Sequence, residues 1–266
     1  MPSPVGELLR RWRTSRGKSQ LELSVDAEVS TRHISFIENG RSAPSREMLL
    51  VLASALDIPL RERNTLLLTA GYAPAYRETS LESPELAHVR AAIDCILQQS
   101  EPNGAVVVDR AWRVVQMNAA AQRILTSFIA DPTVLAELGG DIALALFDER
   151  GLRRSIVNFE EVAGAWITRL HREAAAQGAD GPATGLVARL LAYPGVPARW
   201  REPDPTEQAA LLIPVHLRRG ALEVRLFTTI TTLGTPLDVT LDELRIESYY
   251  PADDATARWL RGDGAS

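Results

Sequence analysis

The sequence contains one cysteine, one lysine and no long apolar run. The single cysteine, Cys95, excludes an internal disulfide, and because it lies in a helical pattern we expect it to be a core thiol on a helix. No apolar stretch approaches the roughly 18 residues that a membrane helix requires, and the polar start "MPSP" lacks a hydrophobic signal segment. We therefore expect a cytoplasmic protein that does not enter a membrane.

The motifs of the common enzyme classes are also missing. The chain has no GxSxG elbow, no HExxH pair, no P-loop and no GxGxxG turn, and no Cys, His and acidic residues stand at metal-ligand spacing. In residues 85–266, His88, His171 and His216 are far apart along the chain, which is typical of structural rather than catalytic histidines. We expect no catalytic residue, no metal site and no cofactor.

What is present is an ordinary globular composition with an uneven distribution of charge. A length of 266 residues, with 45% apolar and 24% charged residues, predicts two domains with sizeable cores. Of the 29 basic residues 28 are arginine, which suits bidentate contacts to phosphate and guanine but is also what a GC-rich genome produces. Residues 1–46 hold eight basic and five acidic residues, a surplus of three in a chain of net charge −5. The N-terminal part is therefore basic and the remainder acidic.

The first seventy residues predict five short helices. Apolar residues within 5–12 recur at i, i+3, i+4 and i+7, which is the stripe of an amphipathic helix. The following helices begin after serine caps and end at glycine, and their short connections indicate one bundle. The predicted caps are Ser19, Ser30 and Ser45, Pro59 opens the last helix, and Gly40 and Gly71 end helices.

The remainder predicts an α+β domain. Residues 72–84 have the composition of a linker, and a helix over about 85–99 leads into a hairpin, "AVVV" and "RVVQM". A mainly helical part over 118–193 precedes three strand-like runs, "ALLIPVHLRR", "ALEVRLFTTITTL" and "ELRIESYY". Two strands, helices and three strands indicate a five-stranded antiparallel sheet with helices on one side. The predicted domains are 1–71 and 85–266, joined by 72–84.

One predicted helix, in "VSTRHISFIENG", has an unusual outer face. On a helical wheel Ile34 and Ile37 point to the core. A basic and aromatic face behind a serine cap suits insertion into a major groove, where arginine binds guanine and phenylalanine contacts a thymine methyl. The alternative is a solvated face with the phenylalanine packed under a loop. The outward residues are Arg32, Ser35, Phe36 and Asn39, with Thr31 at the edge.

The surrounding pattern resembles the helix-turn-helix of the XRE family, to which lambda-type phage repressors belong. The matching residues are Gln20, Leu23, Val29, Ser30, Ile34, Ile37, Glu38, Asn39, Gly40, Arg41 and Pro44. The resemblance covers residues 5–70 and implies a five-helix DNA-binding domain. It departs at Glu28 and Ser24, where the family has glycine and alanine, and a left-handed Glu28 costs roughly 1–2 kcal/mol. It implies that Gln20, Asn39 and Arg41 hold phosphates and that Thr31, Arg32 and Phe36 face bases; Ser30 and Ser35 complete the candidate DNA-binding residues.

From residue 57 onward the chain resembles the MmyB-like transcription regulators. The matching stretches are "LDIPLRERNTLLLTAGYAPAY", "VVVDRAWRVVQMNAAA", "GLRRSIVNFEEVAGAWITRL" and "TTLGTPLDVTLDELRIESYYPADDAT". The resemblance implies a PAS-like domain whose cavity accepts an apolar ligand, with fatty acids as the expected class. In this domain we expect Asp238 to close a turn.

A fatty-acid carboxylate requires a charge-assisted donor, while the apolar residues Trp112, Met117, Phe147, Phe159 and Trp166 suit a closed core as well as a cavity. The candidate ligand-binding residues are Arg153, Asn158, Trp166 and His216.

These patterns together predict a transcription regulator that binds double-stranded operator DNA as a homodimer and responds to a small apolar ligand. A homodimer is expected because one small helix-turn-helix contacts too few bases for specificity. The alternative is a DNA-tethered protein-interaction scaffold, such as an antitoxin, without a small-molecule ligand. An enzyme domain fused to the DNA-binding domain is the third and least favoured interpretation.

Overall fold

The computed structural model describes residues 3–177, 181–202, 214–234 and 236–263. The chain divides into two compact units. Unit 1 consists of residues 1–79, 175–180 and 235–242, and unit 2 of residues 80–174, 181–234 and 243–266. Both units therefore contain segments that are far apart in the sequence.

Unit 1 contains the five predicted helices. Ser19, Ser30 and Ser45 each cap a helix, their side chains accepting a hydrogen bond from the backbone N–H three residues on. Gly40 has a φ of +70°, so the predicted left-handed helix end is confirmed. The helices are α1 (Pro4–Ser15), α2 (Gln20–Asp26), α3 (Thr31–Glu38), α4 (Arg46–Ala55) and α5 (Leu60–Thr69), with the short α12 (Val239–Asp242) from the later segment.

The core of unit 1 fixes α3 against α1. Ile34 and Ile37 are 1% and 0% exposed and pack in one cluster with Leu9 and Trp12. At Gly6 of α1, a Cβ atom would lie 2.4 Å from the Ile37 carbonyl oxygen, so only glycine allows this approach. The position of α3 is thus set by close backbone packing as well as by apolar burial.

Unit 2 is built on a five-stranded antiparallel sheet in the order β2-β1-β5-β4-β3. The predicted hairpin is confirmed as β1 and β2, and the three later strands follow the helical middle. Residues 203–213, which include the start of the predicted run "ALLIPVHLRR", lie outside the described residues. The strands are β1 (Gly104–Val108), β2 (Val114–Met117), β3 (Val215–Arg219), β4 (Leu222–Thr232) and β5 (Arg245–Pro251).

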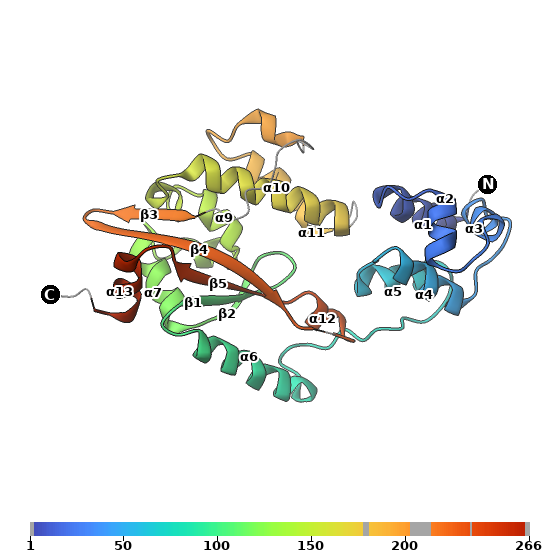
Figure 1. Ribbon diagram of the computed structural model, residues 1–266, viewed down its shortest axis with the longest axis horizontal. Helices are drawn as coiled ribbons and strands as arrows, with labels where there is room; N and C mark the ends of the chain where they lie inside the picture. The colour runs from blue at the N-terminus through green and yellow to red at the C-terminus, as the bar shows by residue number, and fades with distance from the viewer. Residues whose placement is uncertain (1–2, 178–180, 203–213, 235, 264–266) are drawn as a thin grey trace. The chain divides into compact units, whose positions relative to one another are not determined.

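Helices cover both faces of the sheet, whereas the sequence predicted one. Every residue of β1 is buried, which requires cover on both sides. On one side Gln116 of β2 donates a hydrogen bond to Asp94 of α6 (Ala87–Ser100), 2.6 Å away, and Figure 1 shows α6 and α10 on opposite sides of the sheet. The other helices are α7 (Ala119–Phe128), α8 (Val134–Glu137), α9 (Ile142–Phe147), α10 (Phe159–Gln177), α11 (Pro182–Leu191) and α13 (Asp254–Arg261), with 3-10 turns Pro84–Leu86, Arg153–Ser155 and Ala198–Arg201.

The prediction of a core thiol at Cys95 is wrong. Cys95 lies on α6 as expected, but its side chain is exposed. The helix buries Ile93 and Leu97, which are four residues apart on one stripe. Cys95 is two residues from each, so it falls on the opposite side of the helix.

Candidate DNA interface and ligand pocket

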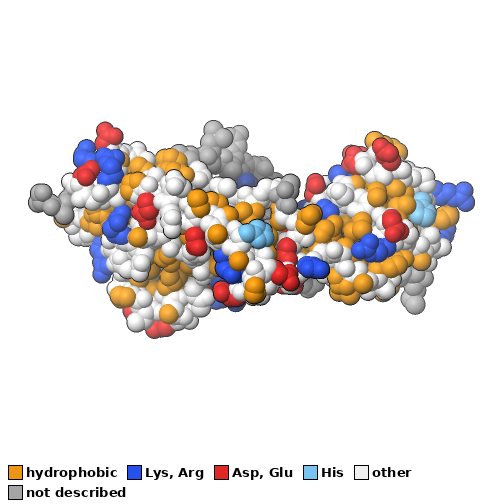
Figure 2. Space-filling view, turned by 90° about the horizontal axis from the view of Figure 1, so that it is seen from below, with side chains coloured by type: hydrophobic (Ala, Val, Ile, Leu, Met, Phe, Trp, Pro, Cys, Tyr) orange, Lys and Arg blue, Asp and Glu red, His pale blue; other side chains and the backbone are white. Residues whose placement is uncertain are grey.

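The outer face of α3 carries two arginines beside one aromatic ring. The guanidinium carbon of Arg32 lies 5.1 Å from the centre of the Phe36 ring, and that of Arg41 lies 5.9 Å from it. Both arginines are exposed and Phe36 is half-buried. Figure 2 shows basic side chains at the outer edge of this helical unit, drawn at the right. The face therefore offers arginine donors held by an aromatic surface.

A buried carboxylate organises the residues around this face. Glu38 is 1% exposed and accepts hydrogen bonds from Arg13 Nε at 2.7 Å and from Gln20 Nε2 at 2.8 Å. Arg10 also reaches Glu38, and its other nitrogen donates to Asn39 Oδ1 at 2.7 Å. Burial works to raise the pKa of Glu38, but the bonds from Arg13 and Gln20 and the charge of Arg13 outweigh it and lower the pKa. The charged carboxylate thus ties α1, α2 and the end of α3 together.

This role of Glu38 was missed by the sequence analysis, which noted the residue only as part of a family pattern. The signal was present, because Glu38 is four residues after Ile34 and one after Ile37 and so falls on the buried side of α3. An acidic residue in that position requires several partners.

None of the eight candidate DNA-binding residues is buried. Thr31 donates to Ser24 Oγ at 3.0 Å, and the Asn39 amide donates to the Ser35 carbonyl at 2.8 Å. The eight residues belong to α2, to α3 or to the residues within three positions of α3: Gln20, Ser30, Thr31, Arg32, Ser35, Phe36, Asn39 and Arg41.

The turn between α2 and α3 contains the expected strained residue. Glu28 has a φ of +54°, in the left-handed region that favours glycine. Its backbone N–H donates to the Val25 carbonyl, and the next N–H, of Val29, donates to Ser24. The glutamate therefore adopts the turn conformation at an energetic cost.

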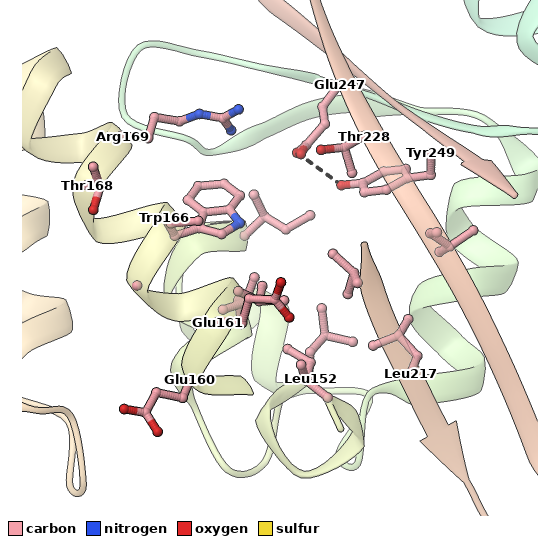
Figure 3. A pocket seen from close by; sticks show the side chains of 18 of the residues that line it. Leu152, Glu160, Glu161, Trp166, Thr168, Arg169, Leu217, Thr228, Glu247 and Tyr249 are labelled. Atoms are coloured by element: carbon pink, nitrogen blue, oxygen red, sulfur yellow. Dashed lines mark hydrogen bonds between the residues drawn. The ribbon is translucent and has the colours of Figure 1, made fainter. Parts of the chain in front are cut away.

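Unit 2 contains a pocket of about 540 Å³ between the sheet and the helices on one face (Figure 3). This volume is in the range of small-molecule sites. The sheet contributes Val215, Leu217, Leu226, Thr228, Glu247 and Tyr249; the other lining residues are Ala121, Ile124, Leu125, Ile142, Leu146, Leu152, Ile156, Glu160, Glu161, Val162, Gly164, Ala165, Trp166, Thr168, Arg169, Arg172, Arg199 and Trp200.

Two tryptophans and an arginine form one side of the pocket region. Trp112 and Trp166 meet edge to face with ring centres 4.6 Å apart, and Arg169 lies 5.4 Å and 5.5 Å from those two rings. Trp112 is fully buried with a φ of +62°, and its indole N–H donates to Glu173 at 2.9 Å. A left-handed conformation is rare for so bulky a residue, so packing holds Trp112 against α10 at an energetic cost.

The pocket has a buried acidic group on β5. Glu247 is 2% exposed and accepts a hydrogen bond from the Tyr249 hydroxyl, with 3.2 Å between the oxygens. Burial raises the pKa of Glu247, while the charge of Arg169 and hydrogen bonds from Tyr249 and Thr228 oppose this shift. Burial also raises the pKa of the Tyr249 phenol well above its usual value. The register places these groups on one face, because Thr228 of β4 lies opposite Tyr249.

The four candidate ligand-binding residues lie in different places. Trp166 lines the pocket, and the other three do not belong to the described lining. Arg153 lies over the Phe159 ring at 4.6 Å. Asn158 accepts a hydrogen bond from the His216 backbone N–H at 3.0 Å, and the His216 ring contacts Glu223 at 2.7 Å.

Of the large apolar residues considered from the sequence, Trp112 and Phe147 are fully buried in the core, and Met117 and Phe159 pack against it. Sequence analysis did not identify Arg169, Thr228, Glu247 or Tyr249, and no local motif marks them. Asp238 closes a turn as predicted, accepting from the Thr240 N–H at 2.9 Å.

Two comparisons with protein families match these two parts of the chain. A helix-turn-helix family model matches residues 9–63, and the model of the MmyB-like transcription regulator ligand binding domain matches residues 89–262. A helix-turn-helix followed by a ligand-binding domain defines a DNA-binding transcription regulator. The chain belongs to the MmyB-like transcription regulators, with an XRE-type helix-turn-helix.

Two relatives and one solved structure are similar to the chain over very different lengths. The transcriptional regulator ClgR of two Mycobacterium tuberculosis strains is 40% identical over 74 residues, which is 28% of this chain and 63% of each relative. Among solved structures, an RNA-binding light-oxygen-voltage receptor aligns over 97% of this chain and 62% of its own at 13% identity. Its TM-score of 0.30 is too low to indicate a shared fold.

No described helix is long and apolar enough to cross a membrane. Within the described residues, no three His, Cys, Asp or Glu side chains are grouped so as to hold a metal ion.

Proposed function

We propose that the protein binds a palindromic operator as a homodimer and that its second domain senses an apolar small molecule, with fatty acids as the leading class. The observation that carries this proposal is the 540 Å³ pocket, whose wall combines aliphatic residues with charged and polar ones from the sheet and from α10. A pocket that offers both apolar wall and charged groups suits an amphiphile. Such a pocket in a transcription regulator is a means of control by a ligand.

In this proposal the basic face of α3 enters the major groove. Thr31, Arg32 and Phe36 face bases, while Gln20, Asn39 and Arg41 hold phosphates. Support comes from the exposed arginines at Phe36 and from the Glu38 network, which fixes Gln20 and Asn39 before DNA arrives. Pre-ordered side chains lose less conformational entropy on binding.

Dimerisation is proposed from the size of the DNA-binding unit. One helix-turn-helix reads few base pairs, and paired half-sites are the usual solution. The measurement is sedimentation of the protein with an operator selected from random DNA: two chains per duplex support the dimer, and one chain contradicts it.

The ligand is tested by native mass spectrometry of the purified protein, followed by solvent extraction. A bound lipid-like mass supports the sensor. If no such mass is found and a panel of fatty acids leaves the melting temperature unchanged, the sensor proposal fails. The scaffold, in which this domain binds another protein, is then the remaining alternative.

A further inference from the structure

One part of the pocket combines a half-buried arginine, Arg169, with the buried carboxyl group of Glu247. Arg169 lines the pocket, and in the part of the chain that the structure describes no hydrogen bond or ion pair reaches its guanidinium. Its contacts are instead with the Trp112 and Trp166 rings. Stacking fixes the plane of the guanidinium but leaves its five N–H donors for another group.

The acceptor is the carboxyl group of Glu247. In Figure 3 the Arg169 side chain extends toward Glu247, which lies beside Thr228 and Tyr249. Burial raises the pKa of Glu247, and the charge of Arg169 opposes this rise, although no ion pair joins the two side chains. A carboxylate has about four acceptor positions, and Tyr249 and Thr228 account for two hydrogen bonds. Glu247 therefore keeps capacity to accept from a ligand.

The side chains of Arg169 and Glu247 determine which polar head group of a ligand fits here. A simple carboxylate binds Arg169 but lies close to the acidic Glu247. A primary amine binds Glu247 but lies close to the cationic Arg169. A group that offers an acceptor and a neutral donor side by side satisfies both. A hydroxyl next to a carboxylate is such a group, because the carboxylate accepts from arginine and the hydroxyl donates to glutamate.

We propose that Arg169 and Glu247 form a two-part subsite for a hydroxylated fatty acid, in which the ligand carboxylate binds Arg169 and a nearby ligand hydroxyl donates to Glu247. This rests on the proposed fatty-acid-sensing function and narrows its ligand class. The aliphatic chain lies along the wall formed by Leu125, Leu146 and Leu217. Tyr249 holds the Glu247 carboxyl in place through its hydrogen bond.

The test compares decanoic acid with 3-hydroxydecanoic acid by titration calorimetry on the full-length protein. We expect the hydroxy acid to bind about 10- to 100-fold more tightly, because a hydrogen bond to a charged group discriminates at this level. Glu247→Leu should reduce this ratio to below about threefold. Arg169→Leu should weaken both acids and leave the ratio in place. Arg258→Gln, which removes an exposed arginine outside the pocket lining, is the matched control and should change neither affinity.

The outcomes separate this subsite from the general proposal. Equal affinities of the two acids for the wild-type protein, or an unchanged ratio in Glu247→Leu, overturn the subsite while the fatty-acid sensor remains. Binding of neither acid overturns the fatty-acid class itself and the subsite with it. The wild-type comparison needs no variant, so it stands even if Glu247→Leu does not fold.

Discussion

At the scale of single residues, Glu28 and Glu38 of unit 1 lead to predictions about the stability of the fold. Glu28 has a left-handed backbone conformation. The resemblance implied that the family usually has glycine at this position. We expect Glu28→Gly to raise the free energy of unfolding by about 0.5–1 kcal/mol, since relief of strain exceeds the added entropy of the unfolded chain. Urea unfolding measures this change in the free energy of unfolding. Glu22→Gly, inside α2, is the control and should destabilise; a loss of stability in Glu28→Gly would contradict the strain.

Glu38 gives a second prediction at the residue scale. Its pKa is lowered in the folded state, so the charged carboxylate stabilises the fold above the ordinary pKa of glutamate, and this stabilisation disappears as the pH falls through the lowered value. Glu38→Gln should cost about 3 kcal/mol at pH 7, because Arg13 loses its buried partner.

The cost should shrink in acid, where the wild-type carboxylate is itself protonated. Melting temperatures between pH 3 and pH 7 test this, with the exposed Glu7→Gln as control. A cost that does not depend on pH would show that the charge of Glu38 is not what stabilises the network.

At the scale of elements, DNA-binding measurements test whether α3 is the recognition helix. Arg32→Ala should weaken specific binding by about 1–3 kcal/mol and relax the preference at one base pair. Arg41→Ala should weaken binding to all DNA sequences alike and lower the slope of log K against log salt concentration by about one. Fluorescence anisotropy at several salt concentrations measures both. Arg258→Ala, which removes an equal charge from an exposed position on α13, is the control; if all three variants bind alike, α3 is not the recognition helix.

Most elements could be predicted because their signals are local. Ser19, Ser30 and Ser45 begin helices where a serine precedes an apolar stripe, and the β-rich runs form the predicted sheet. The predictions from sequence failed where burial depends on which neighbouring element covers a given side of a helix or of the sheet. Cys95 lies on the predicted helix but on its exposed side. The helical pattern alone does not say which of two stripes meets the sheet.

The pocket could be predicted only in outline. Trp166 was a candidate because large apolar side chains line both cores and cavities, and it does line the pocket. Arg169 and Glu247 could not be found, because they are 78 positions apart and only the packing of α10 on β5 gives them a common role. Their local sequences resemble an ordinary helix surface and an ordinary strand.

At the scale of the whole molecule, the connection between β4 and β5 belongs to unit 1, while both strands carry pocket residues. Within unit 1, Asp238 accepts a hydrogen bond from the Thr79 N–H at 3.1 Å, and Val239 donates to the Arg77 carbonyl at 2.8 Å. We propose that a shift of these strands on ligand binding acts on this segment, which is bonded to residues 77 and 79.

Asp238→Ala should uncouple the two functions. We expect ligand affinity to change less than about twofold, because Asp238 is not part of the pocket lining, while the effect of ligand on operator affinity falls toward zero. Calorimetry and anisotropy measure the two quantities. Asp263→Ala, near the end of α13, serves as control. If Asp238→Ala keeps the full ligand effect, the β4–β5 connection does not transmit it.

The central claim is that occupancy of the pocket changes operator binding. It is tested most directly by titrating the full-length protein into a selected operator at fixed salt, with and without saturating 3-hydroxydecanoic or decanoic acid. Typical couplings of about 1–3 kcal/mol predict a 5- to 150-fold change in operator affinity, and the operator must change ligand affinity by the same factor. Measurable binding of either acid with an unchanged operator affinity would contradict the account, because the ligand would then fill the pocket without regulating the protein.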